Sequence, residues 1–190
     1  MEWYCDTCFC DVIEKRIRKY IRTETPVEKN EHLLILGELC MSVLKAILHD
    51  LPITLSLFKT EKELAAAQRL HIHARVVLPW TMDREIGTFL GNFFQGKSVC
   101  EDKRIIKLFM SVTERELNKY TEIRKLSYPS IAHDPVFDVL DALEEKYPSS
   151  KYSLLKSANA LRPFLERGNS NGNIKDITVD GHEHGHTIEY

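Results

Sequence analysis

The segment "EHLLILGELCMSVLKAILHD", residues 31–50, is rich in leucine and isoleucine. Apolar side chains recur in it at intervals of three and four residues, as on one face of a helix. These positions are Leu33, Leu36, Cys40, Val43 and Ile47, and Leu34, Leu44 and Leu48 widen the same face. The spacing predicts one helix over residues 28–49, ended by Pro52, which would be the most buried helix of the protein.

The same spacing predicts helices along most of the remaining sequence. Thr60 and Glu63 have the form of a capping box, at the start of a helix that runs to Pro79. Thr81 is placed as the N-cap of a further helix, which ends before Gly96. Other helices are predicted over residues 13–21, from about residue 100 to the residue before Pro129, over 136–147, and over 154–165, where Pro163 kinks or shortens the end.

The segments that could form strands are few and short. No segment shows sustained strict alternation, and residues 76–78, "VVL", are the nearest to a strand. We therefore predict an all-α fold, a single-domain antiparallel helical bundle of about six or seven helices. The expected organisation is a Cys-rich N-terminal segment (1–10), the helical bundle (11–167) and a disordered His-containing tail (168–190), which is rich in Gly and Asn.

The composition is that of a single soluble domain. The 190 residues carry a formal net charge of -2, so any nucleic-acid surface has to be a local patch. No apolar run reaches the roughly 20 residues that cross a bilayer. Residues 1–10 lack the basic start and the apolar core of a signal peptide. We expect a cytoplasmic protein with no membrane partner.

Two groups of side chains are candidates for metal binding. Cys5 and Cys8 have the spacing that aims two thiolates at one tetrahedral ion, and Cys10 could add a third ligand. In the tail, His182, His184 and His186 alternate with other residues and could wrap a zinc, nickel or copper ion. Reduced thiols and a disordered tail are the competing interpretations. We expect no cofactor, with zinc at either group as the alternative.

A third candidate uses the histidines at the two ends of residues 31–50. His32 and the pair His49–Asp50 resemble the metal ligands of the HD phosphohydrolases. On one unbroken helix these ends lie about 25 Å apart, at 1.5 Å per residue. They could share an ion only if the helix broke near Gly37.

The segment "EIRKLSYPSIAHDP", residues 122–135, supplies candidate catalytic residues. Arg124 and Lys125 stay protonated and could hold a phosphate group. His133 titrates near neutral pH and could move a proton to or from a ribose hydroxyl. Together they are adequate for metal-free RNA cleavage, whereas a surface ion pair and a helix cap are the competing interpretation.

The longer segment "TEIRKLSYPSIAHDPVFDVLDAL", residues 121–143, resembles the HEPN superfamily, and within it phage-defence-associated all-α proteins. The resemblance implies an all-α bundle, often dimeric, that is an RNase or a partner of a nucleotidyltransferase. The family signature is an arginine followed after four to six residues by a histidine. Here His133 matches, but Arg124 and Lys125 lie farther away, with eight and seven residues between.

The resemblance favours a non-catalytic or divergent HEPN-like helical protein, which acts through RNA or protein-partner binding in a defence or toxin–antitoxin context. One alternative is a metal-independent HEPN-type endoribonuclease that uses His133 with Arg124 or Lys125. Another is a helical interaction protein unrelated to HEPN. The expected partners are an RNA, a cognate protein, or a second copy that packs on an apolar helix face. The aromatic residues Trp80, Phe89, Phe93 and Phe94 suggest that face.

Overall fold

Residues 31–50 form a strand followed directly by a helix, so the single helix predicted over 28–49 is wrong. The strand β1 (His32–Leu36) ends at Gly37, and the helix α2 (Glu38–Ile47) begins with the next residue. Gly37 has φ 84° and ψ 152°, a conformation that residues with a side chain rarely adopt. Its N–H donates to the carbonyl oxygen of Phe58 over 2.9 Å. The glycine therefore lets the chain leave a sheet and start a helix within one residue.

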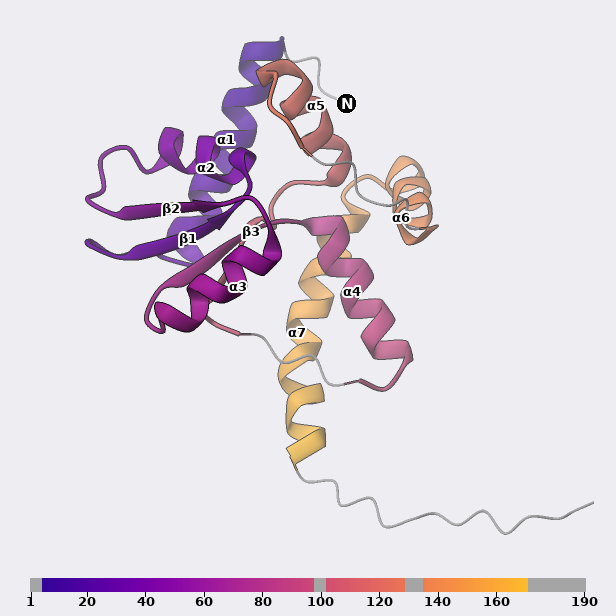
Figure 1. Ribbon diagram of the computed structural model, residues 1–190. Helices are drawn as coiled ribbons and strands as arrows, with labels where there is room; N and C mark the ends of the chain where they lie inside the picture. The colour runs from indigo at the N-terminus through magenta and orange to yellow at the C-terminus, as the bar shows by residue number, and fades with distance from the viewer. Residues whose placement is uncertain (1–4, 98–101, 129–134, 171–190) are drawn as a thin grey trace, which may run out of the picture.

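The structure is a computed structural model that describes residues 5–97, 102–128 and 135–170, with side chains as far as Phe164 (Figure 1). Among these residues, no helix is long and apolar enough to cross a membrane. The other elements are α1 (Asp6–Thr23), β2 (Thr54–Phe58), α3 (Glu61–Leu70), β3 (Arg75–Thr81), α4 (Met82–Phe94), β4 (Ile105–Phe109), α5 (Glu114–Arg124), α6 (Pro135–Lys146) and α7 (Ser150–Ser170).

The strands make one parallel sheet in the order β2-β1-β3-β4. The fold is therefore α/β, and the predicted all-α helical bundle is wrong. Leu33, Leu34 and Ile35 of β1 are all fully buried. Successive side chains of a strand point to opposite faces, so this burial requires that helices cover both sides of the sheet.

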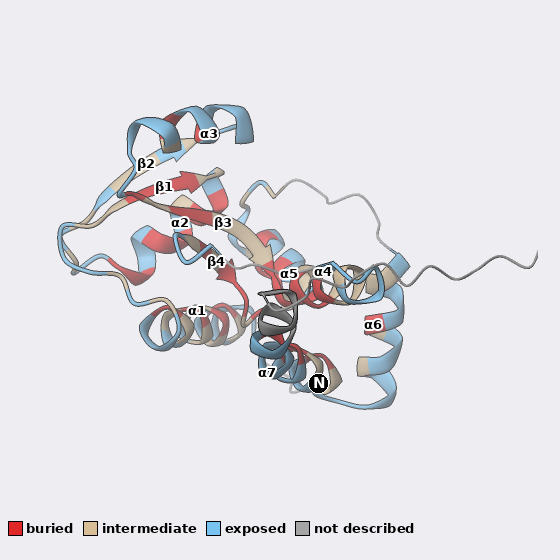
Figure 2. Cartoon of the chain, turned by 90° about the horizontal axis from the view of Figure 1, so that it is seen from below, coloured by how far each residue is buried: buried red, intermediate tan, exposed pale blue. Residues whose placement is uncertain are grey.

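Helices cover the two faces unequally, as Figure 2 shows. On one face, α1 and α2 pack with Leu33 and Ile35 around the largest core. On the other face, α3 packs through Leu64 and Ala67 on Leu34. A further core lies beyond the sheet, where α4, α6 and α7 pack together around Ile86. This second group of helices is held against the carboxyl ends of β3 and β4.

Several of the predicted helix boundaries are confirmed. Thr60 accepts a hydrogen bond from the N–H of Glu63 at the start of α3, and Thr81 caps α4. Helices α1, α6 and α7 also lie where the spacing predicted them, and α7 continues through Pro163. Two predicted helices are wrong in part: the one from residue 60 to 79 ends at Leu70 and is followed by β3, and the one from residue 100 to 128 contains β4.

A substitution at Gly37 tests the strand–helix junction. An added Cβ would meet no atom within 4 Å, so Gly37→Ala is free of clashes and changes only the backbone preference. We expect it to lower the free energy of unfolding by about 1–3 kcal/mol, the usual cost of such a conformation for a residue with a side chain. Urea denaturation measures this change.

Gly91 provides the matched control for this substitution. It lies inside α4, where an added Cβ also meets no atom within 4 Å. Gly91→Ala should stabilise the protein by up to about 1 kcal/mol, because alanine is the better helix former. Equal effects of the two substitutions would contradict the role given to Gly37.

Candidate functional site

A pocket lies at the carboxyl ends of β1 and β3. The chain leaves β1 toward β2 on one side, whereas β3 pairs on the other side, so the strand order reverses at this point. In open α/β sheets ligands bind in the crevice at such a reversal. The pocket has a volume of about 460 Å³, within the range of small-molecule sites. Its walls are Leu36, Gly37, Glu38, Leu39, Lys59, Glu61, Leu78, Pro79, Trp80, Arg84, Ser127 and Tyr128.

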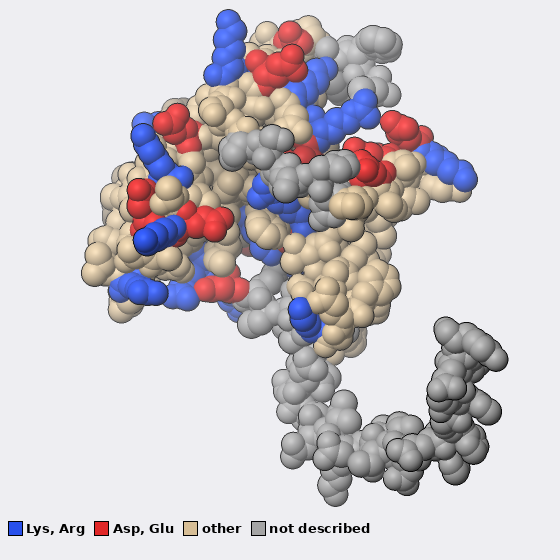
Figure 3. Space-filling view, turned by 45° about the vertical axis from the view of Figure 1, so that its right-hand side comes forward, with Lys and Arg blue, Asp and Glu red and all other residues tan. Residues whose placement is uncertain are grey.

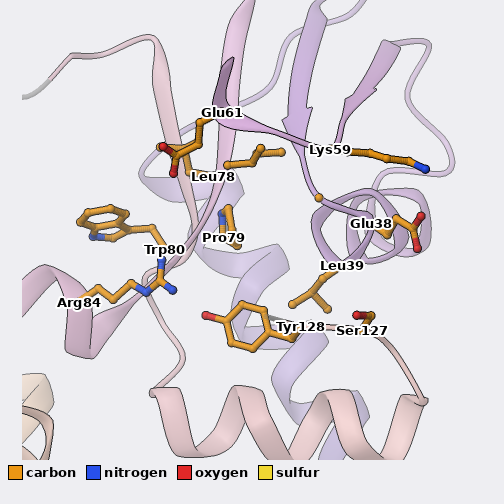
Figure 4. A pocket seen from close by; sticks show the side chains of 12 residues that line it. Glu38, Leu39, Lys59, Glu61, Leu78, Pro79, Trp80, Arg84, Ser127 and Tyr128 are labelled. Carbon is orange, nitrogen blue, oxygen red and sulfur yellow. The ribbon is translucent and has the colours of Figure 1, made fainter. Parts of the chain in front are cut away.

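Pro79 and Trp80 reach the pocket because β3 is irregular there. Leu78 pairs with Lys107 and Thr81 with Phe109, so three steps along β3 match two along β4. This extra residue makes a bulge, and proline is tolerated at a bulge because it has no N–H to donate to the neighbouring strand. Bulges re-aim side chains, and here the indole ring of Trp80 lines the pocket beside Pro79 (Figure 4).

Two cations line the pocket, Lys59 and Arg84, and neither has a carboxylate partner among the described residues; Arg84 is the one that lies against aromatic rings. Its guanidinium lies 5.9 Å from the centre of the Trp80 ring. Its Nε is buried and makes no hydrogen bond to any described residue. Figure 4 shows the guanidinium between the rings of Trp80 and Tyr128. It is therefore placed to donate hydrogen bonds to a ligand that lies against these rings.

Tyr128 forms the opposite wall and is anchored through Glu114. Its hydroxyl donates to Oε1 of Glu114 over 3.0 Å, and Thr81 donates to Oε2 of the same carboxylate over 2.7 Å. Burial, followed by the negative charge of Glu114, raises the pKa of Tyr128 above its ordinary value. The phenol stays protonated at neutral pH, so its ring is held in place as a neutral aromatic surface.

The beginning of α2 offers no loop that could wrap a phosphate group. One glycine separates β1 from α2, whereas phosphate sites at helix starts use glycine-rich loops whose N–H groups surround the anion. Glu38 also puts a carboxylate in the first turn of α2, where the helix dipole favours an anion. Glu38 and Glu61 balance the charges of Lys59 and Arg84 in the pocket lining. The pocket therefore suits a ligand portion without net negative charge.

Buried ion pairs hold the first turn of α4, which carries Arg84. Glu85 accepts hydrogen bonds from Trp80 Nε1 over 2.7 Å, from Lys107 over 2.8 Å, and from Arg162 of α7. Burial alone would raise the pKa of Glu85, but the hydrogen bond and charge of Lys107 and the charge of Arg162 outweigh it and lower the pKa. The side chain of Trp80 is thus fixed by a carboxylate that stays ionised.

A second carboxylate fixes the same turn from the other side. Asp83 is fully buried, forms an ion pair with Lys151 of α7, and accepts a hydrogen bond over 2.6 Å from the N–H of Glu114. Lys151 also pairs with Asp141 of α6. The pocket wall formed by α4 is therefore tied to α5, α6 and α7.

The residues that the sequence predicted as catalytic do not gather in this pocket. Arg124 donates to Oε1 of Glu14 on α1 over 2.6 Å and is thus engaged in an ion pair between two helices. Lys125 ends α5 in a left-handed conformation with φ 53° and is exposed. His133 lies outside the described residues. The described part of the proposed catalytic group is therefore separate from the pocket.

The three predicted metal ligands at the N-terminus do not form one group: Cys5 and Cys8 lie together at the exposed start of α1, whereas Cys10 is buried. The sulfur of Cys5 caps α1 by accepting a hydrogen bond from the N–H of Cys8, which lowers the pKa of Cys5. Cys10 is buried on the inner side of α1, and burial raises its pKa. Among the described residues no three His, Cys, Asp or Glu side chains are placed to hold a metal ion. His182, His184 and His186 lie outside the described residues.

The aromatic residues that suggested a dimer surface are divided between three environments. Phe89 is buried and stacks on Phe93 with ring centres 6.0 Å apart. Phe93 and Phe94 are exposed near the end of α4, whereas Trp80 lines the pocket. Pairing of two copies through Phe93 and Phe94 stays a prediction.

The comparison with solved structures identifies a protein of similar fold. The U34-tRNA thiolase NcsA from Methanococcus maripaludis with its [4Fe-4S] cluster matches with a TM-score of 0.63 and 16% sequence identity. The match covers 84% of this chain and 80% of that chain. No family model matches the sequence, and no curated protein matches it. The likeness confirms the α/β fold with a parallel sheet.

This likeness corrects the family and the functions predicted from the sequence. The resemblance to the all-α HEPN superfamily is wrong, because the match and the parallel sheet define a different fold. The HEPN-like binding protein, the HEPN-type endoribonuclease with His133 and Arg124 or Lys125, and the unrelated helical interaction protein are set aside with it. Each of them depended on a helical bundle.

The prediction about cofactors is also corrected by this comparison. We expected none, with zinc at the cysteines or the tail as the alternative, whereas the structure of similar fold carries a [4Fe-4S] cluster. Such a cluster is held by cysteine thiolates that meet at one point. In the described residues Cys5 and Cys8 are exposed at the start of α1, and Cys10 and Cys40 are buried in the core. These four cysteines do not fit a cluster.

The sequence analysis did not find Trp80, Arg84 or Tyr128. A signal for their surroundings was present in two short apolar runs, residues 33–36 followed by Gly37 and residues 76–78 followed by Pro79. Short apolar runs that end at a glycine or proline are typical of buried parallel strands. The carboxyl ends of two such strands would have indicated the pocket.

A substitution of Glu85 tests how the pocket wall is held. Glu85→Gln removes the negative charge that Lys107 and Arg162 share, so we expect the free energy of unfolding at pH 7 to fall by about 3–5 kcal/mol. The folded-state pKa of Glu85 is lowered from 4.5, so its contribution is present above about pH 4.5 and is lost as the pH falls through the lower folded value. The difference between the two proteins should therefore shrink below pH 4.5.

Urea denaturation at several pH values between 3 and 7 measures this difference. Glu145→Gln is the control, because Glu145 is exposed and makes only a 3.7 Å ion pair with the exposed Arg115. It should change the free energy of unfolding by less than about 1 kcal/mol. A pH-independent difference for Glu85→Gln would contradict the ionised state given to this carboxylate.

Proposed function

We propose that this chain takes part in tRNA modification by holding one nucleoside of a tRNA in the pocket at the carboxyl ends of β1 and β3. The observation that carries this proposal is the guanidinium of Arg84, which has no carboxylate partner in the described part of the chain and lies between the rings of Trp80 and Tyr128. The pocket combines aromatic rings with a planar group of hydrogen-bond donors, the guanidinium of Arg84. A flat base with ring carbonyl oxygens matches both features.

The chemistry of the walls favours a nucleobase over an aliphatic ligand. Bases stack on aromatic side chains and on guanidinium planes, and an alanine substitution of such a side chain costs about 1–3 kcal/mol per base. Arg84 can donate to a base carbonyl, and the apolar Leu36, Leu39 and Leu78 exclude water around it. The volume of about 460 Å³ leaves room for a base with its ribose.

The charges of the pocket favour a nucleoside within an RNA over a free nucleotide with several phosphates. The single-glycine turn at Gly37 and the carboxylate of Glu38 leave no cradle for a phosphate chain. In an RNA the phosphates of a splayed-out nucleoside can stay outside the pocket. The fold likeness to a U34-tRNA thiolase over 84% of the chain supports tRNA as the RNA concerned.

Substitutions of the two central side chains test the proposal. We expect Trp80→Ala and Arg84→Ala each to weaken binding of an unmodified tRNA transcript about tenfold, because each removes a contact to the base worth about 1–3 kcal/mol. Fluorescence anisotropy with a labelled tRNA measures the affinity. Trp80→Phe keeps a stacking surface and should retain most of the affinity.

Arg69→Ala is the charge-matched control for Arg84→Ala, because Arg69 is exposed on α3 away from the pocket. It should change the affinity less than twofold. Equal losses for Arg84→Ala and Arg69→Ala would show that only overall charge matters, and the nucleoside pocket would then be abandoned.

A substitution of Glu38 tests the discrimination against phosphate. The carboxylate lies in the first turn of α2, so Glu38→Gln removes a negative charge at the place where a 5′-phosphate would approach. Wild-type protein should bind uridine more tightly than uridine monophosphate. Glu38→Gln should reduce this preference severalfold, as measured by ligand-observed NMR titration. A wild-type preference for the monophosphate would count against the proposal.

A further inference from the structure

A second hollow of about 830 Å³ lies between α1 and α7, beside the edge strand β4. Figure 2 shows α1 and α7 on the same side of the sheet. The residues on its α1 side include Arg16, Lys19 and Thr23, which are spaced by three or four and share one helix face. The residues on its α7 side, Tyr152, Lys156 and Asn159, follow the same spacing. We call this hollow the α1–α7 groove.

The lining of the α1–α7 groove is strongly basic, although the whole chain carries a net charge of -2. Among the described residues, five lysines and arginines line it, against one carboxylate, that of Glu24. On the face shown in Figure 3, by contrast, basic and acidic side chains are mixed. A local excess of positive charge in a hollow raises the concentration of polyanions there. The groove is thus the kind of local patch that a protein of this net charge needs for nucleic-acid binding.

Three of the five cations are available to a ligand. Arg16 is paired with Glu116, and Arg162 is paired with Glu85. Lys19, Lys103 and Lys156 are exposed and have no ion pair among the described residues. They come from α1, from the turn before β4, and from α7, so they surround the groove instead of forming a row on one helix. Lysines that are free and placed in this way suit a chain of phosphates that runs through the groove.

We propose that the α1–α7 groove binds the phosphodiester backbone of an RNA, with Lys19, Lys103 and Lys156 on its phosphates and Tyr152 stacked on a base. The ring of Tyr152 is 63% exposed, so it can receive a base without being moved. This aromatic surface beside free cations favours a single-stranded nucleic acid over an acidic peptide. The inference rests on the proposed function only in naming tRNA as the RNA.

The groove and the nucleoside pocket can be tested separately. A triple variant, Lys19→Gln, Lys103→Gln and Lys156→Gln, should bind an unmodified tRNA transcript at least about tenfold more weakly at 100 mM salt. The slope of log affinity against log salt concentration should fall in magnitude by about 2, because each lost phosphate contact removes roughly 0.7. The control triple variant changes three exposed lysines elsewhere, Lys29→Gln, Lys45→Gln and Lys62→Gln. It should leave both quantities nearly unchanged.

Two further measurements identify the ligand. Tyr152→Ala should weaken binding at least about fivefold, the lower end of the effect of losing one stacked base, whereas Tyr147→Ala, at another exposed tyrosine, should have no effect. Poly-glutamate at matched charge concentration should not displace the tRNA. Displacement as efficient as that by unlabelled RNA would overturn the assignment to RNA in favour of an acidic peptide.

The outcomes distinguish this inference from the proposed function. If the two lysine triple variants bind tRNA equally well, the groove proposal is overturned, whatever Trp80→Ala does. If the groove variants lose affinity while Trp80→Ala and Arg84→Ala do not, the groove binds RNA and the nucleoside pocket is wrong. Unchanged circular dichroism and thermal midpoints of the lysine variants, which alter only exposed side chains, would show that the losses are not due to unfolding.

Discussion

The backbone conformation of Gly37 is the constraint on which the rest of the structure depends. β1 is an inner strand that pairs with β2 on one side and β3 on the other. The chain therefore has to leave the extended conformation directly after Leu36, because α2 begins at Glu38. The positive φ of Gly37 makes this turn within one residue, and its N–H to the carbonyl of Phe58 ties the turn to the end of β2. The same short turn leaves the pocket without a glycine-rich phosphate loop, so one glycine shapes both the sheet and the pocket.

Buried charges hold the pocket wall in place, and they matter more for the orientation of α4 than for the stability of the protein. Asp83 and Glu85 are both almost fully buried in the first turn of α4, where apolar side chains of the same volume would often give equal or greater stability. An apolar core could not orient the indole N–H of Trp80 or fix α7 at Lys151 and Arg162. Because hydrogen bonds to a carboxylate are directional, these two residues hold α4 in one register against α5 and α7. The wall that carries Trp80 and Arg84 is therefore rigid before a ligand arrives.

Local signals in the sequence predicted those parts of the fold that local interactions determine. Thr60 and Thr81 cap helices in the structure as predicted. Such a cap is a local interaction, because the hydroxyl accepts a hydrogen bond from the N–H of a residue only three positions later. β1 was mistaken for part of a helix because both faces of the strand are buried, so its consecutive residues 33–36 are all apolar. A continuous apolar run also contains the three- and four-residue spacing that is typical of a helix. β3 and β4 each lie next to a helix whose apolar spacing could be extended over the strand. The two short apolar runs indicate only the edge of the sheet at which the pocket lies. Its side chains could not be found from a motif, since Trp80, Arg84 and Tyr128 meet only through strand order and a bulge.

Glu85 connects the two regions that we assign to RNA. One of its oxygens accepts from Trp80, which lines the nucleoside pocket, and the other accepts from Arg162, which lines the α1–α7 groove. The two hollows therefore share one buried carboxylate in the first turn of α4. A single RNA could place a base against Trp80 and Arg84 while its backbone continues toward Lys156. Its phosphates would then meet cations in the groove and would avoid the carboxylate of Glu38, so the distribution of charge between the hollows would orient the RNA that we propose as the ligand.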